Sequence, residues 1–160
     1  VNRKIVSEPP GDNEMVRPLA HDRRPRRARK PRSMTDAQQI QLDPDPLEPY
    51  HLSQGFRVGD LVIVSGQAAL DEHGRVVGAG DFDAQAEQTF RNLSRVLEAG
   101  GSSLDRIVKV TIFLTDMQDF AKVNAIYAEA FKELPPARPT VQVSGLPKGV
   151  NVEIEVLACK

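Results

Sequence analysis

The chain has 160 residues, of which 40% are hydrophobic and 27% are charged, a composition typical of a soluble globular protein with one domain and one core. No apolar run approaches the about 20 residues that cross a bilayer, so we expect no membrane partner. The single cysteine, Cys159, permits no internal disulfide and no cysteine metal cluster, and no stretch resembles a secretory signal, which predicts a cytoplasmic protein.

The net charge of −1 is unevenly distributed along the chain. Residues 1–33 carry ten Lys and Arg against four Asp and Glu, a local charge of +6, whereas residues 34–160 carry eleven against eighteen, a local charge of −7. The run RRPRRARKPR at 23–32 repels itself and contains helix-breaking prolines, which predicts disorder. We interpret residues 1–40 as a basic leader, with Met34 as a candidate natural start. The alternative, a nucleic-acid-binding arm, is disfavoured because no aromatic residue precedes position 34.

Strand signals dominate the first part of the domain. Three prolines within residues 41–50 favour an extended segment. Phe56–Val64 contains Gly59-Asp60, a turn signal between two strand-like arms. Residues 67–70 and 75–77 are predicted to pair as a second hairpin around a four-residue loop.

The hydrophobic period changes to that of a helix at Asp81. Asp81 or Asp83 can cap the helix start, and Gly100-Gly101 can end it in a left-handed turn. A β-branched run at Ile107–Leu114 then predicts a strand. The expected apolar face of the first helix is Phe82, Ala86, Phe90, Leu93 and Leu97, and that of a second helix is Phe120, Val123, Tyr127 and Phe131.

The predicted order is three strands, a helix, a strand, a helix and two strands, the last two near 139–143 and 150–158. This order favours one mixed six-stranded sheet with both helices on one face, a two-layer α+β domain over residues 41–160. In the final strand, alternation separates an apolar face from a face that carries Glu153 and Glu155. Such a mixed face suits a partner surface or a cleft.

Two side chains of the closing strands are chemically informative. The guanidinium of Arg138 can hold a small carboxylate in a two-bond fork. The carboxylate of Glu153 can orient a water molecule or move a proton. The alternatives are a salt bridge from Arg138 to Glu153, Glu155 or a helix end, and a solvated or ion-paired Glu153.

The motifs around these residues resemble those of the Rid family (RidA, also called YjgF), the reactive-intermediate deaminases. The resemblance covers roughly Pro46 to Ala158. The C-terminal motifs that carry it are Pro136-Ala137-Arg138, Leu146-Pro147-Lys148 and Val152-Glu153-Ile154-Glu155. The motifs that precede them in order are Pro49-Tyr50, Val64-Ser65-Gly66-Gln67, Lys109-Val110-Thr111 and Val123-Asn124.

The resemblance implies a chorismate-mutase-like fold and a homotrimer with a central barrel and a ligand cleft at each subunit interface. It implies hydrolysis of 2-imino acids or their enamines, such as 2-iminobutanoate and 2-iminopropanoate, to 2-keto acids and ammonia, without a cofactor. By resemblance, Arg138 holds the substrate carboxylate and Glu153 positions the attacking water. The remaining residues expected to bind substrate are Tyr50, Ser65, Gly66, Asn124 and Thr140.

Two positions depart from the family pattern. Glu48 replaces the glycine that precedes Pro-Tyr in the family. The resemblance therefore does not determine the path of the backbone at Tyr50. Thr140 stands where many members have cysteine, so a thiol's reactivity is lost. Ser65 lacks an obvious His or Asp partner, which argues against a serine nucleophile.

Other function classes remain as alternatives. The scattered histidines have no metal-ligand spacing, and we expect no metal. A non-catalytic trimer that binds small carboxylates, or acts like a chaperone, is the second hypothesis. RNA cleavage is the third, and the −7 balance of residues 34–160 disfavours nucleic acid as a partner.

Overall fold

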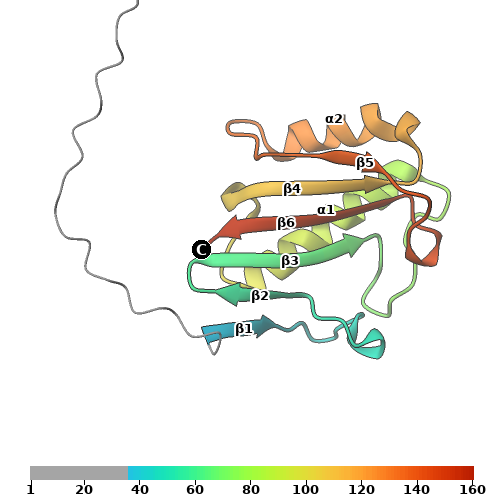
Figure 1. Ribbon diagram of the computed structural model, residues 1–160. Coiled ribbons are helices and arrows are strands. Elements are labelled where there is room, and N and C mark those ends of the chain that lie inside the picture. The colour runs from blue at the N-terminus through green and yellow to red at the C-terminus, as the bar shows by residue number, and fades with distance from the viewer. Residues whose placement is uncertain (1–35) are drawn as a thin grey trace, which may run out of the picture. The chain divides into compact units, whose positions relative to one another are not determined.

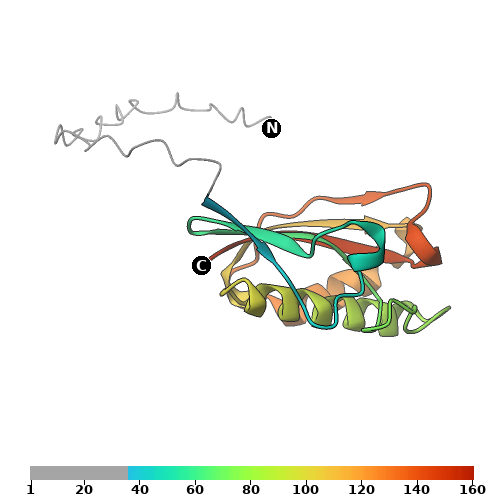
Figure 2. The ribbon, with the colours of Figure 1, turned by 90° about the horizontal axis from the view of Figure 1, so that it is seen from below.

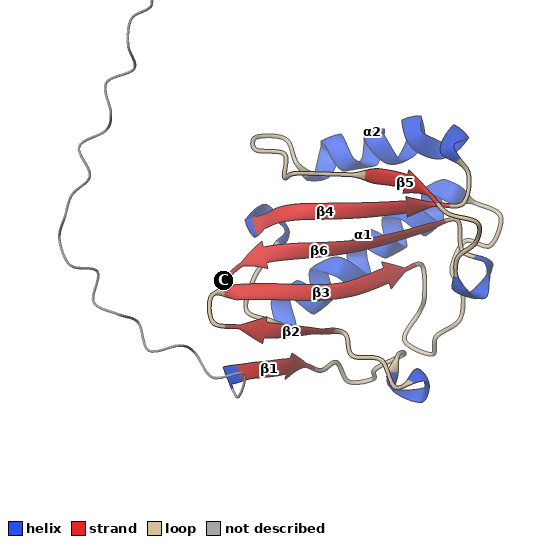
Figure 3. Cartoon of the chain, viewed as in Figure 1, coloured by secondary structure: helices blue, strands red, loops and turns tan. Residues whose placement is uncertain are grey.

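The computed structural model describes residues 36–160, which form a mixed sheet and two helices (Figures 1 and 3). The elements are β1 (Ala37–Ile40), β2 (Gly55–Val58), β3 (Leu61–Ala68), α1 (Phe82–Ala99), β4 (Ile107–Leu114), α2 (Phe120–Ala130), β5 (Thr140–Gln142) and β6 (Val152–Cys159). The strand order across the sheet is β1-β2-β3-β6-β4-β5. Neighbouring strands are antiparallel except β4 and β5, which are parallel.

Both helices pack on one face of the sheet (Figure 2), which confirms the predicted two-layer α+β architecture. The core lies between the layers. Val152 and Ile154 of β6 are completely buried there, together with Leu93 and Leu97 of α1 and Val123 of α2. Because side chains alternate along a strand, Glu153 and every second residue after it on β6 face away from the helices.

Local signals set the ends of α1 as predicted. The Asp81 side chain accepts a hydrogen bond from the Ala84 amide, 3.1 Å away, which satisfies one of the free amides of the first turn. Beyond the helix, Gly101 adopts a left-handed backbone with φ of +78°, a conformation that glycine takes without a Cβ penalty. The helix thereby runs along the sheet and carries Asn92 and Arg95 to one end of the cavity described below.

Of the local predictions about strands, the one for the N-terminal edge of the sheet is wrong. The sequence interpretation places no strand before residue 41, whereas β1 pairs antiparallel with β2 at the sheet edge. Only Ile40 of β1 is buried, so the segment shows almost no hydrophobic alternation. The expected hairpin at 67–70 and 75–77 is present in short form. Leu70 and Val76 pair antiparallel, and backbone hydrogen bonds join Asp71 to Arg75 and Val77 to Ala69.

Residues 1–35 of the predicted basic leader lie outside the described residues, and so does the candidate start at Met34. Within residues 36–160, neither α1 nor α2 combines the length and the apolar character that a bilayer crossing requires.

Candidate active site

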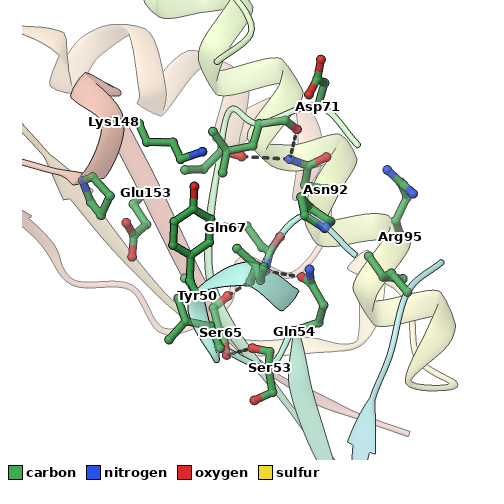
Figure 4. A pocket seen from close by; sticks show the side chains of 18 of the residues that line it. Tyr50, Ser53, Gln54, Ser65, Gln67, Asp71, Asn92, Arg95, Lys148 and Glu153 are labelled. Carbon is green, nitrogen blue, oxygen red and sulfur yellow. Dashed lines mark hydrogen bonds between the residues drawn. The ribbon is translucent and has the colours of Figure 1, made fainter. Parts of the chain in front are cut away.

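A cavity of about 630 Å³ lies between the segment 42–54, the end of β3, β6 and α1 (Figure 4). Four of the residues predicted for the site line it: Tyr50, Ser65, Gly66 and Glu153. Lys148 lines it as well, from a short 3₁₀ turn at Pro147–Gly149. The structure therefore brings together residues that lie about a hundred positions apart in the chain.

Tyr50 forms part of the cavity wall. The segment that was expected to be extended closes into a 3₁₀ turn at Glu48–Tyr50, and His51 follows with a left-handed φ of 55°. The Lys148 ammonium lies 5.0 Å from the centre of the Tyr50 ring and donates a hydrogen bond to the Gly74 carbonyl. A cation over an aromatic face is attracted by the ring's electron density. Lys148 thus links the Tyr50 turn to the loop around Gly74.

Ser65 and Gly66 lie where the pairing of β3 with β6 is irregular, between Val64 and Gln67. Bulges of this kind bend a strand and redirect its side chains, and they are frequent beside active sites. The Ser65 hydroxyl donates a hydrogen bond of 2.7 Å to the Ser53 carbonyl. Ser65 therefore holds the 42–54 segment against β3, and no described histidine or acid contacts it as a catalytic base would.

Gly66 allows a close approach of Glu153. A Cβ atom built on Gly66 would lie 2.0 Å from Glu153 Oε1 and 2.8 Å from its carboxyl carbon. The absence of a side chain at position 66 thus defines where the carboxylate sits. Any larger residue would have to displace it.

Glu153 is half-buried and stands apart from the ion pairs of the sheet. Burial raises the pKa of its carboxyl, and the nearby charge of Glu155 raises it further. Glu155 itself accepts a hydrogen bond of 3.1 Å from the Lys109 ammonium, in agreement with its predicted structural role. No hydrogen bond or ion pair joins the Glu153 carboxylate to another described side chain. It is therefore free to hold a water molecule and, with its raised pKa, to exchange a proton.

Arg138 lies in a second cluster, two residues before β5 begins at Thr140. Its Nη2 donates a hydrogen bond of 2.9 Å to Asn124 Oδ1. The guanidinium lies 4.2 Å from the centre of the Tyr127 ring and 5.7 Å from that of Phe120. Burial raises the pKa of the Tyr127 hydroxyl, and the Arg138 cation opposes that effect. These contacts hold the guanidinium plane in one orientation.

The Arg138 cluster contains unsatisfied polar atoms. Arg138 Nη1 and Thr140 Oγ1 are buried, and neither has a hydrogen-bond partner among the described residues. Buried donors without partners are rare in folded proteins and mark sites where an external group can bind. The cluster therefore contains an N–H and a hydroxyl whose hydrogen bonds a bound water or anion would complete.

The two clusters occupy opposite faces of the sheet. Ile154 pairs with Ile112, and Ile112 pairs with Thr140. Since paired residues of neighbouring strands point to the same face, Thr140 and Arg138 lie on the helix side with Ile154. Glu153 faces the other side, and neither Arg138, Asn124 nor Thr140 lines the cavity. Within one chain, the seven predicted site residues thus form two separate groups.

Sequence reasoning missed the roles of Lys148 and Tyr127. The sequence places Lys148 within a motif and Tyr127 on the apolar face of a helix, and it assigns neither a role in the site. One signal was available for Tyr127. Phe120, Asn124 and Tyr127 are spaced by four and three residues, which places them on one face of a helix, where they can all meet Arg138.

Residues 41–160 match the profile of the family described as Endoribonuclease L-PSP. A RutC family protein of Pyrococcus horikoshii is 44% identical over 117 residues, which cover 73% of this chain and 91% of the relative. The protein HMF1 of Saccharomyces cerevisiae is 43% identical over 108 residues, which cover 68% and 83% of the two chains.

Solved structures agree with these sequence matches. The crystal structure of RidA from the Antarctic bacterium Psychrobacter sp. is 41% identical, with a TM-score of 0.71, over 77% of this chain and 99% of that one. The YjgF gene product of E. coli is 36% identical, with a TM-score of 0.70, over 77% and 98% of the two chains.

Proposed function

Because this chain belongs to the YjgF/RidA (Rid, Endoribonuclease L-PSP) family, we propose that it is a deaminase of reactive 2-imino acids and their enamine tautomers. The products are the 2-keto acid and ammonia, and 2-iminobutanoate and 2-iminopropanoate are the simplest substrates. Its active site is shared between two subunits of a homotrimer. One subunit contributes Arg138, Asn124 and Thr140, and its neighbour contributes Glu153 with Tyr50, Ser65 and Gly66.

One observation carries this proposal: neighbouring side chains orient the Arg138 guanidinium but do not accept hydrogen bonds from all of its N–H groups. Asn124 occupies one nitrogen of the guanidinium, while the buried Nη1 has no partner. A carboxylate that accepts from Nη1 and Thr140 Oγ1 would satisfy both atoms, and charge-assisted hydrogen bonds of this kind are strong. This is the recognition that a 2-imino acid requires.

The shared site follows from the placement of the two clusters. Arg138 and Glu153 face opposite sides of one sheet, so a small substrate cannot contact both in a single chain. The face that carries Glu153 also exposes apolar side chains. These are Phe56, Val58, Ile63 and Val141, each 39–41% exposed. An exposed apolar sheet face of this kind favours burial against another copy of the chain.

The mechanism requires few groups. Arg138 fixes the substrate carboxylate, so that the reacting carbon is held near the neighbouring subunit's Glu153. Glu153 accepts a proton from a water molecule as its oxygen adds to the carbon of the protonated imine. The same carboxyl then gives the proton to the nitrogen of the tetrahedral adduct. As the C–N bond breaks and ammonia leaves, Glu153 accepts the proton of the adduct's hydroxyl, and the keto acid forms. The raised pKa of Glu153 suits these transfers, and no step requires a cofactor.

The alternatives make different demands on the same residues. A non-catalytic carboxylate-binding trimer would need Arg138 but not the proton transfers of Glu153. An endoribonuclease would have to attract a polyanion, although residues 34–160 carry eleven basic residues against eighteen acidic ones.

The test uses imines that an amino-acid oxidase generates from amino acids in the assay mixture. The full chain is expected to accelerate release of the 2-keto acid and to reduce trapping of the imine by semicarbazide. If keto acids bind to the protein but no imine is hydrolysed faster, the non-catalytic alternative replaces the proposal.

Replacing Gly66 with alanine is expected to lower kcat by on the order of 100-fold with little change in thermal stability, since a displacement of about 1 Å in a reacting group has that effect. The added Cβ would force the Glu153 carboxylate out of place. Gly145→Ala is the matched control, because a Cβ there meets no atom within 4 Å. Equal rates for the two variants would show that the contact between Gly66 and Glu153 does not set the geometry of the reaction.

A further inference from the structure

The cavity beside Glu153 is larger than the smallest imino acids require. Its volume of about 630 Å³ falls in the range of about 300–1,000 Å³ that encloses drug-sized ligands. In Figure 4, Glu153 and Lys148 lie on one side of the Tyr50 ring, and Asn92 and Arg95 lie on the other. The space therefore continues from the proposed reaction centre, past the tyrosine, toward α1.

The wall of this further space is mainly aliphatic. The side chains that form it come from the 42–54 segment and from the residues after β3, and they include Leu42, Leu47, Leu52 and Leu70. Such a surface favours a ligand group without polar atoms, and each methylene group moved into it from water strengthens binding by about fourfold.

The amide side chains of the same wall, those of Gln54, Gln67 and Asn92, are hydrogen-bonded within the protein. The Gln54 amide donates a hydrogen bond of 2.6 Å to Asp45 Oδ1. The Gln67 amide donates one of 3.1 Å to Gln54 Oε1. The Asn92 amide donates to the carbonyl oxygens of Ala68 and Leu70, at 2.8 and 2.9 Å. An apolar group can fill the space without leaving these amides unpaired.

The orientation of the substrate connects the cavity to the reaction, and this step rests on the proposed function. The substrate carboxylate is held by Arg138 of one subunit, and the reacting carbon faces Glu153 of the other. The third substituent of that carbon, the amino-acid side chain, then points away from Arg138 and into the cavity of the Glu153 subunit.

From this arrangement we propose that the preferred substrates are 2-imino acids with large apolar side chains, such as the imines of leucine and phenylalanine. The cavity selects them over the imine of alanine. The expected preference in kcat/KM is on the order of tenfold or more, because a side chain of several carbon atoms gains about fourfold for each methylene group it buries.

The test compares imines formed by an amino-acid oxidase from alanine, leucine and phenylalanine, with the full chain and semicarbazide as a competing trap. Two variants narrow the cavity from two different parts of its lining: Leu47→Trp in the 42–54 segment and Leu70→Phe after β3. The control is Leu134→Trp, the same substitution as at Leu47, at a side chain that is 86% exposed and does not line the cavity.

The expected result is faster hydrolysis of the leucine and phenylalanine imines by the unmodified chain. Both narrowing variants should lose that preference to within about twofold and keep the alanine rate, since the removed contacts concern only the side chain. Thermal unfolding identifies a variant that fails to fold. The other variant then shows whether the cavity sets the substrate preference. Equal rates on all three imines, or an equal loss on all of them in the folded variants, would overturn the preference and leave the deaminase assignment standing. No acceleration on any imine would overturn both.

Discussion

The Arg138→Lys variant is expected to lose imine hydrolysis by about 100-fold or more in kcat/KM, and Arg138→Ala to lose it almost completely. A lysine ammonium cannot donate to Asn124 and to a carboxylate in the planar fork that Arg138 offers, nor can it stack in the same way at 4.2 Å from the Tyr127 ring. A charged hydrogen bond contributes about 1.5–3 kcal/mol, which corresponds to roughly 10- to 150-fold in rate.

Arg91→Lys is the control for the Arg138 variants. Arg91 is an exposed arginine of α1 whose charge contact is with Glu87, one helical turn away, so its replacement should leave the rate unchanged. Size-exclusion chromatography would establish that every variant keeps the assembly of the unmodified chain. Imine hydrolysis by Arg138→Lys at near-normal rates would show that Arg138 does not grip the substrate.

Replacement of Glu153 with glutamine is expected to lower kcat by about 100- to 10,000-fold, the range attributed to a positioned general base, while keto-acid binding persists. The amide has nearly the shape of the carboxyl group but cannot accept the proton of the attacking water. Single-turnover hydrolysis and calorimetric titration with a keto acid would separate the two effects. A loss of binding equal to the loss in kcat/KM would instead make Glu153 a substrate-binding residue.

The pH dependence of the unmodified chain gives a second measure of Glu153. Since burial and Glu155 raise the pKa of its carboxyl, the rate should rise with pH around a midpoint above the ordinary glutamate value of about 4.3. Glu155→Gln should keep the activity and move this midpoint to lower pH, because it removes one of the two causes. A midpoint that Glu155→Gln leaves in place would contradict the assignment.

The same shift predicts the effect of Glu153 on stability. A carboxyl whose pKa is raised by folding binds its proton more tightly in the folded state, so its ionisation costs stability as pH rises through that range. Glu153→Gln should therefore unfold at the same or a higher temperature than the unmodified chain at pH 7. The difference should disappear below about pH 4, the range in which the carboxyl becomes protonated in the unfolded as well as the folded state.

Much of the fold was predictable because local patterns and packing agree. The β-branched run Ile107–Leu114 is β4, and the apolar period that starts at Asp81 is the buried face of α1. Alternation in β6 correctly separated the core face from the face of Glu153. β1 was missed because it is an edge strand with one buried residue, and only its pairing with β2 makes it a strand.

The site was predictable as a set of residues but not as an arrangement. Motifs pointed to both Arg138 and Glu153, yet their opposite orientations depend on the registers that join Ile154, Ile112 and Thr140 across three strands. Those registers arise from long-range pairing, and a shift by one residue would reverse the faces. The contact of Lys148 with the Tyr50 ring likewise depends on a turn that proline content alone does not reveal.

The central claim is that Arg138 of one subunit and Glu153 of its neighbour form one catalytic site. Co-expression of Arg138→Ala chains and Glu153→Gln chains, each with its own tag, would test it most directly. Doubly purified mixed trimers should recover hydrolysis, because each contains both kinds of chain and therefore about one of its three shared sites has both intact residues, while each variant alone stays inactive. Mixed assemblies as inactive as the parent variants, in the presence of an active unmodified control, would contradict a site shared between subunits.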